Sequence, residues 1–115
     1  MNIKSLYDTV VLRTPCSHNQ FLTHLDTTVR TLTAQYSMPY VLLRGESYGV
    51  PRSIENDIPV YEEYSPAVVD NILYLLTGDT DRKTDYVQEA EAAYKAVWSR
   101  MARGRTIRGR GYYDV

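Results

Sequence analysis

The chain has 115 residues, 43% of them hydrophobic, with a single cysteine and a formal net charge of −1. This length suits one small domain with its own core, and the lone Cys16 excludes an internal disulfide framework and favours a cytosolic origin. Because no run of about 18 apolar residues occurs and the start has no long apolar segment, neither a transmembrane helix nor a signal peptide is expected.

The first predicted helix runs from Asn2 to Arg13. Its apolar side chains recur every three or four residues, as they do on one face of a helix. They are Ile3, Leu6, Tyr7, Val10 and Val11. Pro15 ends the segment, because the residue before a proline is disfavoured in the helical region.

The second predicted helix has a clear start signal. Ser17 and Gln20 have the spacing of a capping box, in which each side chain pairs with a backbone N–H of the first turn. From Phe21 to Tyr36 apolar residues follow at steps of three and four, which predicts one buried helix face. Met38 and Pro39 then stop the helix.

Residues 37–60 break the helical pattern. Tyr40–Leu43 is a short apolar run that suits a strand, and Ile54–Val60 could pair back onto it in a loose hairpin. A connection this long inside a small domain is uncommon unless it is functional or structured. We expect a protruding loop or hairpin available for contacts between subunits, with a mobile surface loop as an equal alternative.

Two further helices are predicted. The third begins near Ser65-Pro66, an N-cap followed by proline at the first position, and ends before Gly78. Residues 61–64 could add an earlier turn, with their acids at the positive helix end. The fourth spans roughly Asp81–Arg103, with aspartates near its start and arginines near its end, and Gly104 closes it.

The predicted fold class is therefore mainly α. We expect an antiparallel bundle of about four helices in residues 1–103, with the loop or hairpin 37–60 inserted, and an extended basic arm in residues 104–115. Met1–Ser99 holds 8 basic and 13 acidic residues, whereas Arg100–Val115 holds five arginines and one acid. Such an arginine- and glycine-rich segment cannot bury enough apolar surface to fold alone, so it is expected to order on a partner.

No catalytic or metal site is predicted. Cys16, His18 and His24 lack the additional ligands that a zinc site needs, so they are interpreted as loop and helix-surface residues. Residues 79–90 only superficially resemble a calcium loop, because Ala90 stands where the bidentate glutamate belongs. Nucleotide-binding and hydrolase motifs are missing. We expect a protein that is not an enzyme and uses no cofactor.

Three roles are open for the basic arm. Arginine forks pair well with carboxylates in an acidic protein groove, which makes protein docking the first choice. A solvated terminus without a role ranks second. Binding of single-stranded nucleic acid through charge and stacking ranks third.

The order of elements along the chain resembles one known family. The segments that carry the likeness are Arg13–Ser17, Phe21–Tyr36, Ile58–Tyr64, Val68–Tyr74, Gly78-Asp79 and Asp85–Tyr94. Together they resemble the head-to-tail adaptor (connector) proteins of tailed bacteriophages, and the resemblance covers most of residues 1–103. It consists of helix and turn patterns without a catalytic signature.

The resemblance implies a structural protein of the virion neck, made in the host cytoplasm. Such adaptors form a homo-oligomeric ring, commonly a dodecamer, that joins the portal protein to a tail or stopper protein. DNA passes through the ring without sequence-specific binding, and no membrane is involved. A negatively charged lumen would keep DNA from sticking, which suits an acidic body.

The resemblance also implies two sets of contact residues. The arm would dock on the portal through Arg103, Arg105, Arg108, Arg110, Tyr112 and Tyr113. The loop would face a neighbouring subunit or the tail through Leu43, Arg44, Tyr48, Val50, Arg52 and Ile54. Two alternatives stay open, a small nucleic-acid-binding regulator that uses the Arg/Gly tail and a tail-completion protein.

Overall fold

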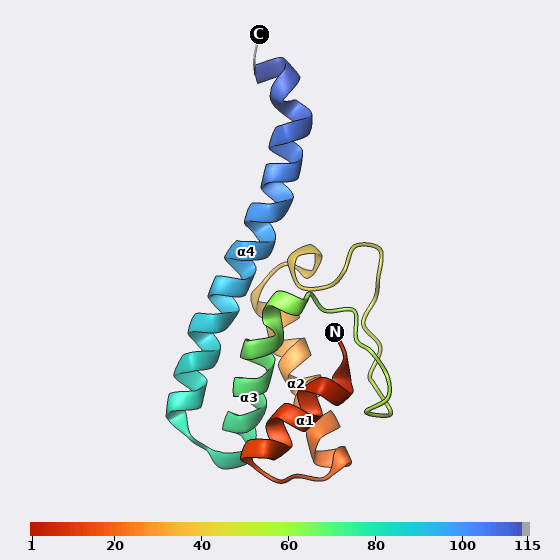
Figure 1. Cartoon of the computed structure of the whole chain (residues 1–115), viewed down its shortest axis with the longest axis vertical. Helices are drawn as coiled ribbons and strands as arrows, with labels where there is room; N and C mark the ends of the chain where they lie inside the picture. The colour runs from red at the N-terminus through yellow and green to blue at the C-terminus, as the bar shows by residue number, and fades with distance from the viewer. Residues whose placement is uncertain (114–115) are drawn as a thin grey trace.

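The computed structural model describes the backbone of residues 1–113 and the side chains of residues 1–102. Within this part the chain is mainly α-helical and contains no strand, which confirms the predicted fold class (Figure 1). The helices are α1 Ile3–Arg13, α2 His18–Gln35, α3 Ser65–Thr77 and α4 Thr80–Tyr113, with the short 3₁₀ helices η1 Met38–Tyr40 and η2 Glu62–Tyr64.

Polar side chains start the first two helices. The Asn2 side chain accepts a hydrogen bond from the Ser5 N–H at 2.9 Å, which satisfies one free donor of α1. At α2 the predicted capping box is present, because the Ser17 hydroxyl accepts from the Gln20 N–H and the Gln20 side chain accepts from the Ser17 N–H. Both helices therefore begin where their local sequence indicates.

Helix α3 forms the centre of the domain. Figure 1 shows it between α4 on one side and α1 and α2 on the other, and it contacts all three. Seven consecutive residues, Ala67 to Leu73, are buried. Two of them are polar. One of the two, Asn71, donates from Nδ2 to the buried Thr28 hydroxyl of α2 at 2.7 Å. Because Asn71 and Thr28 satisfy each other, the two side chains cost little to bury.

The start of α3 differs from the prediction. Ser65 is the first helical residue and not the N-cap, and its hydroxyl donates to Glu62 Oε2 at 3.2 Å. The reason is that η2 leads directly into α3, so the preceding turn takes the place of a side-chain cap. The extra turn expected over residues 61–64 is confirmed, and Gly78 ends α3 in the left-handed conformation with φ 74°.

The end of α4 also differs from the prediction, because the helix continues past Gly104 to Tyr113. Each of the three glycines in this part of the helix costs only about 1 kcal/mol relative to alanine, and the neighbouring arginines favour helix. The side chains of the predicted arm lie outside the described residues, so its docking role stays a prediction. Arg100, the first arginine of the basic segment, is used inside the domain, where it pairs with Glu63 at 2.6 Å.

The insertion between α2 and α3 is a loop without the two expected strands. The predicted segments do meet, but in a single antiparallel bridge between Leu42 and Val60. Pairing cannot spread because Pro59 has no N–H, and the N–H of Leu42 is already bonded to Met38 within the turn of η1. The expected hairpin is therefore not formed and the segment is a loop, while its contact with other subunits stays a prediction.

We predict that replacing Gly78 by alanine lowers the free energy of unfolding by about 1–2 kcal/mol, because φ of +74° is unfavourable for a residue with Cβ. The matched control is Gly49→Ala. A Cβ at either position meets nothing within 4 Å, but only Gly78 has positive φ, so Gly49→Ala should be neutral or slightly stabilising. Urea denaturation of both variants checks this, and equal losses would contradict it.

Candidate interaction surface

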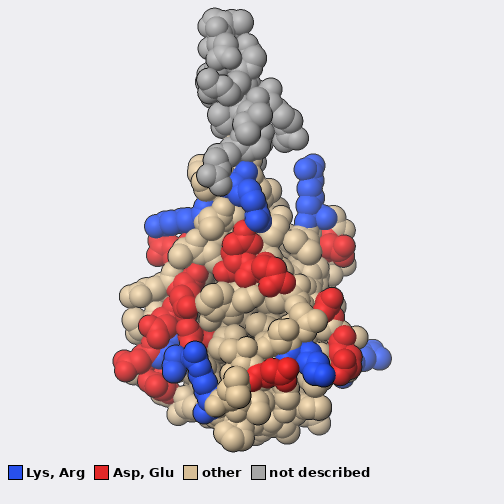
Figure 2. All heavy atoms as spheres, in the orientation of Figure 1, with Lys and Arg blue, Asp and Glu red and all other residues tan. Residues whose placement is uncertain are grey.

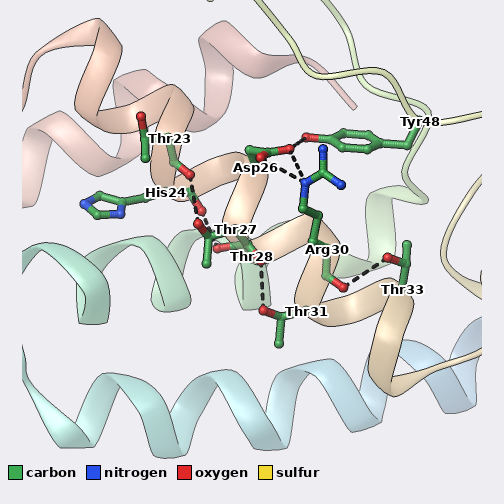
Figure 3. Close-up of polar contacts among 9 residues, drawn as sticks. All are labelled: Thr23, His24, Asp26, Thr27, Thr28, Arg30, Thr31, Thr33 and Tyr48. Carbon is green, nitrogen blue, oxygen red and sulfur yellow. Dashed lines mark hydrogen bonds and ion pairs between the residues drawn. The ribbon is translucent and has the colours of Figure 1, made fainter.

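A charged cluster on α2 anchors the loop of residues 37–60. The Tyr48 hydroxyl donates to Asp26 Oδ1 at 2.7 Å, and Arg30 Nε donates to both oxygens of the same carboxylate at 3.0 and 3.1 Å (Figure 3). The Arg30 guanidinium also lies 5.9 Å from the centre of the Tyr48 ring. One carboxylate thus joins the loop to the helix.

At neutral pH, Asp26 and Tyr48 are in the protonation states that their hydrogen bond requires. Burial raises the pKa of Asp26, but hydrogen bonds from Tyr48 and Arg30 and the positive charge of Arg30 outweigh this and leave the pKa lowered. Burial, together with the Asp26 carboxylate, raises the pKa of Tyr48. Asp26 is therefore ionised and Tyr48 keeps its donor proton.

A groove of about 990 Å³ lies beside this anchor. It is bounded by the last turns of α2, by η1, by residues 42–48 and by Met101 of α4. The apolar side chains that line it are Met38, Tyr40, Leu42, Leu43, Tyr48 and Met101. Charged groups are contributed by Arg30, Arg44 and Glu46. The composition, apolar with a few charges, is typical of surfaces that bind protein.

Two apolar side chains of the groove are uncovered. Met38 is 60% exposed and Leu43 is 38% exposed. Neither is needed to fill the core, which is formed by other residues of all four helices. Exposed methionine and leucine side chains beside a groove are common at surfaces that bind other proteins.

The structure divides the six predicted loop contacts into two groups. Leu43, Arg44 and Tyr48 come together in the groove. Val50, which is 55% exposed, and Arg52 are exposed without lining it, and Ile54 packs against the core. The six arm residues from Arg103 to Tyr113 lie outside the described side chains.

The predicted contact residues include only three that line the groove, and Met38 and Met101 are among those that sequence reasoning missed. In the sequence Met38 serves only as a helix-stop signal with Pro39, and Met101 lies within the predicted fourth helix. Their spacing gives no sign that they line one groove, since η1 and α4 come together only in the folded chain.

A cluster of tyrosines fixes the wall of the groove. The rings of Tyr36 and Tyr94 stack at 4.9 Å, and the Tyr40 ring meets Tyr94 edge-on at 5.6 Å. The hydroxyl of Tyr64 donates to the Tyr40 carbonyl at 2.8 Å. Several of the eleven tyrosines are thus partly buried at the edge of the core, where they hold η1 against α4.

Other reactive residues are not gathered into a site. Within the part of the chain that is described, no three His, Cys, Asp or Glu side chains lie close enough to hold a metal ion. Cys16 is half-buried, and burial raises the pKa of its thiol; burial lowers the pKa of His24 on α2. Tyr7 donates to the Cys16 carbonyl at 3.1 Å, so this turn is part of the packing of α1 on α2.

Comparison with protein-family models, curated proteins and solved structures finds no match for this chain. Among the described helices, none is both long enough and apolar enough to cross a membrane. The candidate surface is therefore assessed from its own geometry.

We predict that Tyr48→Phe destabilises the fold by about 1–2 kcal/mol, because it removes a hydrogen bond to a charged acceptor. The control is Tyr74→Phe, since the Tyr74 hydroxyl makes no hydrogen bond within the described residues. Asp26 has a lowered pKa, so its stabilising effect is present at neutral pH and is lost as the pH falls below 3.8. Urea denaturation at neutral and acidic pH should show the penalty of Tyr48→Phe shrinking in acid.

Proposed function

We propose that this chain is a head-to-tail adaptor of a tailed bacteriophage, which forms a homo-oligomeric ring between the portal and the tail. The observation that carries the proposal is the groove bounded by η1, residues 42–48 and Met101 of α4. It combines uncovered apolar side chains with a loop held in place by the Tyr48–Asp26–Arg30 cluster. A surface of this kind suits contact with another folded subunit.

A ring requires two different surfaces on each copy, because its contacts are head-to-tail. The groove supplies one surface. Leu12 of α1 is 87% exposed, and α1 contributes no residue to the groove. Val87 and Trp98 of α4 are also exposed. The domain thus has uncovered apolar residues outside the groove that a neighbouring groove can receive.

The charge of the domain supports passage of DNA without binding. Met1–Ala102 holds 9 basic and 13 acidic residues. Figure 2 shows the acidic side chains spread over the visible face of the body. Because like charges repel, such a surface does not hold phosphates, whereas a nucleic-acid-binding regulator needs a basic surface.

The contact between subunits can be tested at the groove. We expect the double variant Met38→Asp/Leu43→Asp to lower assembly at least about tenfold, since burying two unpaired charges costs more than 1.4 kcal/mol. Both positions are exposed, so the fold should survive. Mass photometry and negative-stain microscopy measure the assembly. Leu43→Met is the matched control because it keeps the surface apolar.

Two outcomes would count against this role of the groove. Rings formed by the aspartate variant as readily as by the unsubstituted chain would show that the groove does not face a neighbouring subunit. A monomeric unsubstituted chain that stays monomeric on purified portal would exclude the adaptor function itself.

We further predict that deletion of residues 104–115 abolishes binding to portal rings, because it removes Arg105, Arg108 and Arg110. Changing these three arginines to lysine keeps the charge and should retain part of the binding, since lysine lacks the bidentate fork. Co-sedimentation with portal rings measures the binding of the truncated chain and of the lysine variant. Unimpaired binding by the truncated chain would contradict the docking role, and salt-sensitive binding to DNA would favour the regulator instead.

A further inference from the structure

A second cavity, of about 510 Å³, lies away from the groove among α1, η2, α3 and α4. Two acids from adjoining helices line it, Asp70 of α3 and Glu89 of α4. Arg13 of α1 lines it as well, and the Met1 ammonium lies there 3.5 Å from Glu62 Oε1. Neither the groove nor the proposed function uses this cavity.

The two acids have different partners. Asp70 is only 7% exposed, and its Oδ1 accepts a hydrogen bond from Arg82 Nη1 at 3.2 Å. The Oε1 atom of Glu89 is buried and has no hydrogen-bond partner among the described residues. A buried carboxylate oxygen without a donor is unfavourable, whereas a protonated carboxyl can donate to a neighbouring carboxylate.

We propose that Asp70 and Glu89 share one proton, carried by Glu89, and that loss of this proton loosens α4 from α3. The two carboxyl groups line one cavity from adjoining helices, and two neighbouring carboxyl groups do not both ionise readily. Arg82 stabilises the charge on Asp70, so Glu89 is the acid that stays neutral. When Glu89 ionises, the two helices carry like charges at their contact.

The ionisable groups around Glu89 favour this assignment. The pKa of Glu89 is raised to about 7, first by burial and then by the neighbouring Asp70 and Asp85 carboxyl groups. Arg13 of α1 opposes them. The remaining charged groups of the cavity are the Met1 ammonium and Glu62, which form an ion pair, and the Arg82 guanidinium of α4 pairs with Asp70 outside the lining.

The sign of the pH effect follows from this raised pKa. The unfolded carboxyl loses its proton near 4.5, whereas the folded one holds it to about 7. Between these values the folded state binds more protons, so the stability contributed by this pair falls as the pH rises through the window. This inference does not rest on the proposed function, because it concerns only how α4 is held to α3.

Thermal unfolding of Glu89→Gln tests the proposal, since glutamine donates to Asp70 without titrating. We expect the variant and the unsubstituted chain to melt together near pH 4, below both pKa values, and the variant to melt at least about 5 °C higher near pH 8.5. The control Glu91→Gln changes an exposed acid on the same helix. The difference between its melting temperature and that of the unsubstituted chain should therefore not change with pH. The proposal would be overturned if the melting temperatures of Glu89→Gln and the unsubstituted chain differed by the same amount at both pH values.

A direct titration keeps the proposal testable if the variant folds poorly. Carbon-detected NMR of the side-chain carboxyl groups in the unsubstituted chain measures the midpoint of Glu89. A midpoint near 7, accompanied by exchange broadening of the α4 amides above it, is the expected result. A midpoint near 4.5 would show that no proton is shared.

Discussion

The burial of α3 on all sides is the constraint on which the rest of the structure depends. Fully burying a large apolar side chain contributes roughly 1.5–3 kcal/mol, and the run from Ala67 to Leu73 is buried without interruption. Because this run includes Asp70 and Asn71, the helices around it must supply polar partners. Helix α2 supplies Thr28 and α4 supplies Arg82, so the polar groups of α3 select which faces of its neighbours point inward.

The loop between α2 and α3 has a defined shape although it contains little regular structure. Its ends meet at the Leu42–Val60 bridge, and its middle is held to α2 by Tyr48. Near its end, Ile58 exchanges backbone hydrogen bonds with Met1 at 2.9 and 3.0 Å. These separate attachments explain how a surface made mainly from a loop can present a groove with fixed walls, which a specific protein contact requires.

Helix α4 connects the groove with the cavity that contains Asp70 and Glu89. Glu89 faces the buried acid of α3, Tyr94 stacks on the end of α2, and Met101 lines the groove. At 1.5 Å per residue, about 18 Å of helix separates Glu89 from Met101. A change in how firmly the first half of α4 is held therefore acts on the same rigid element that borders the candidate surface.

The sequence by itself determined the helices and most of their ends, because capping and helical periodicity act between residues three or four apart. Ser17 with Gln20 and the turn at Gly78 are of this kind. The hairpin and the stop at Gly104 were wrong, since Pro59 limits the pairing and one glycine is a weak breaker. Only the tertiary structure decided that Met38 and Met101 line one groove and that Asp70 and Glu89 line one cavity, because exposure and ionisation depend on neighbours that lie far away in the sequence.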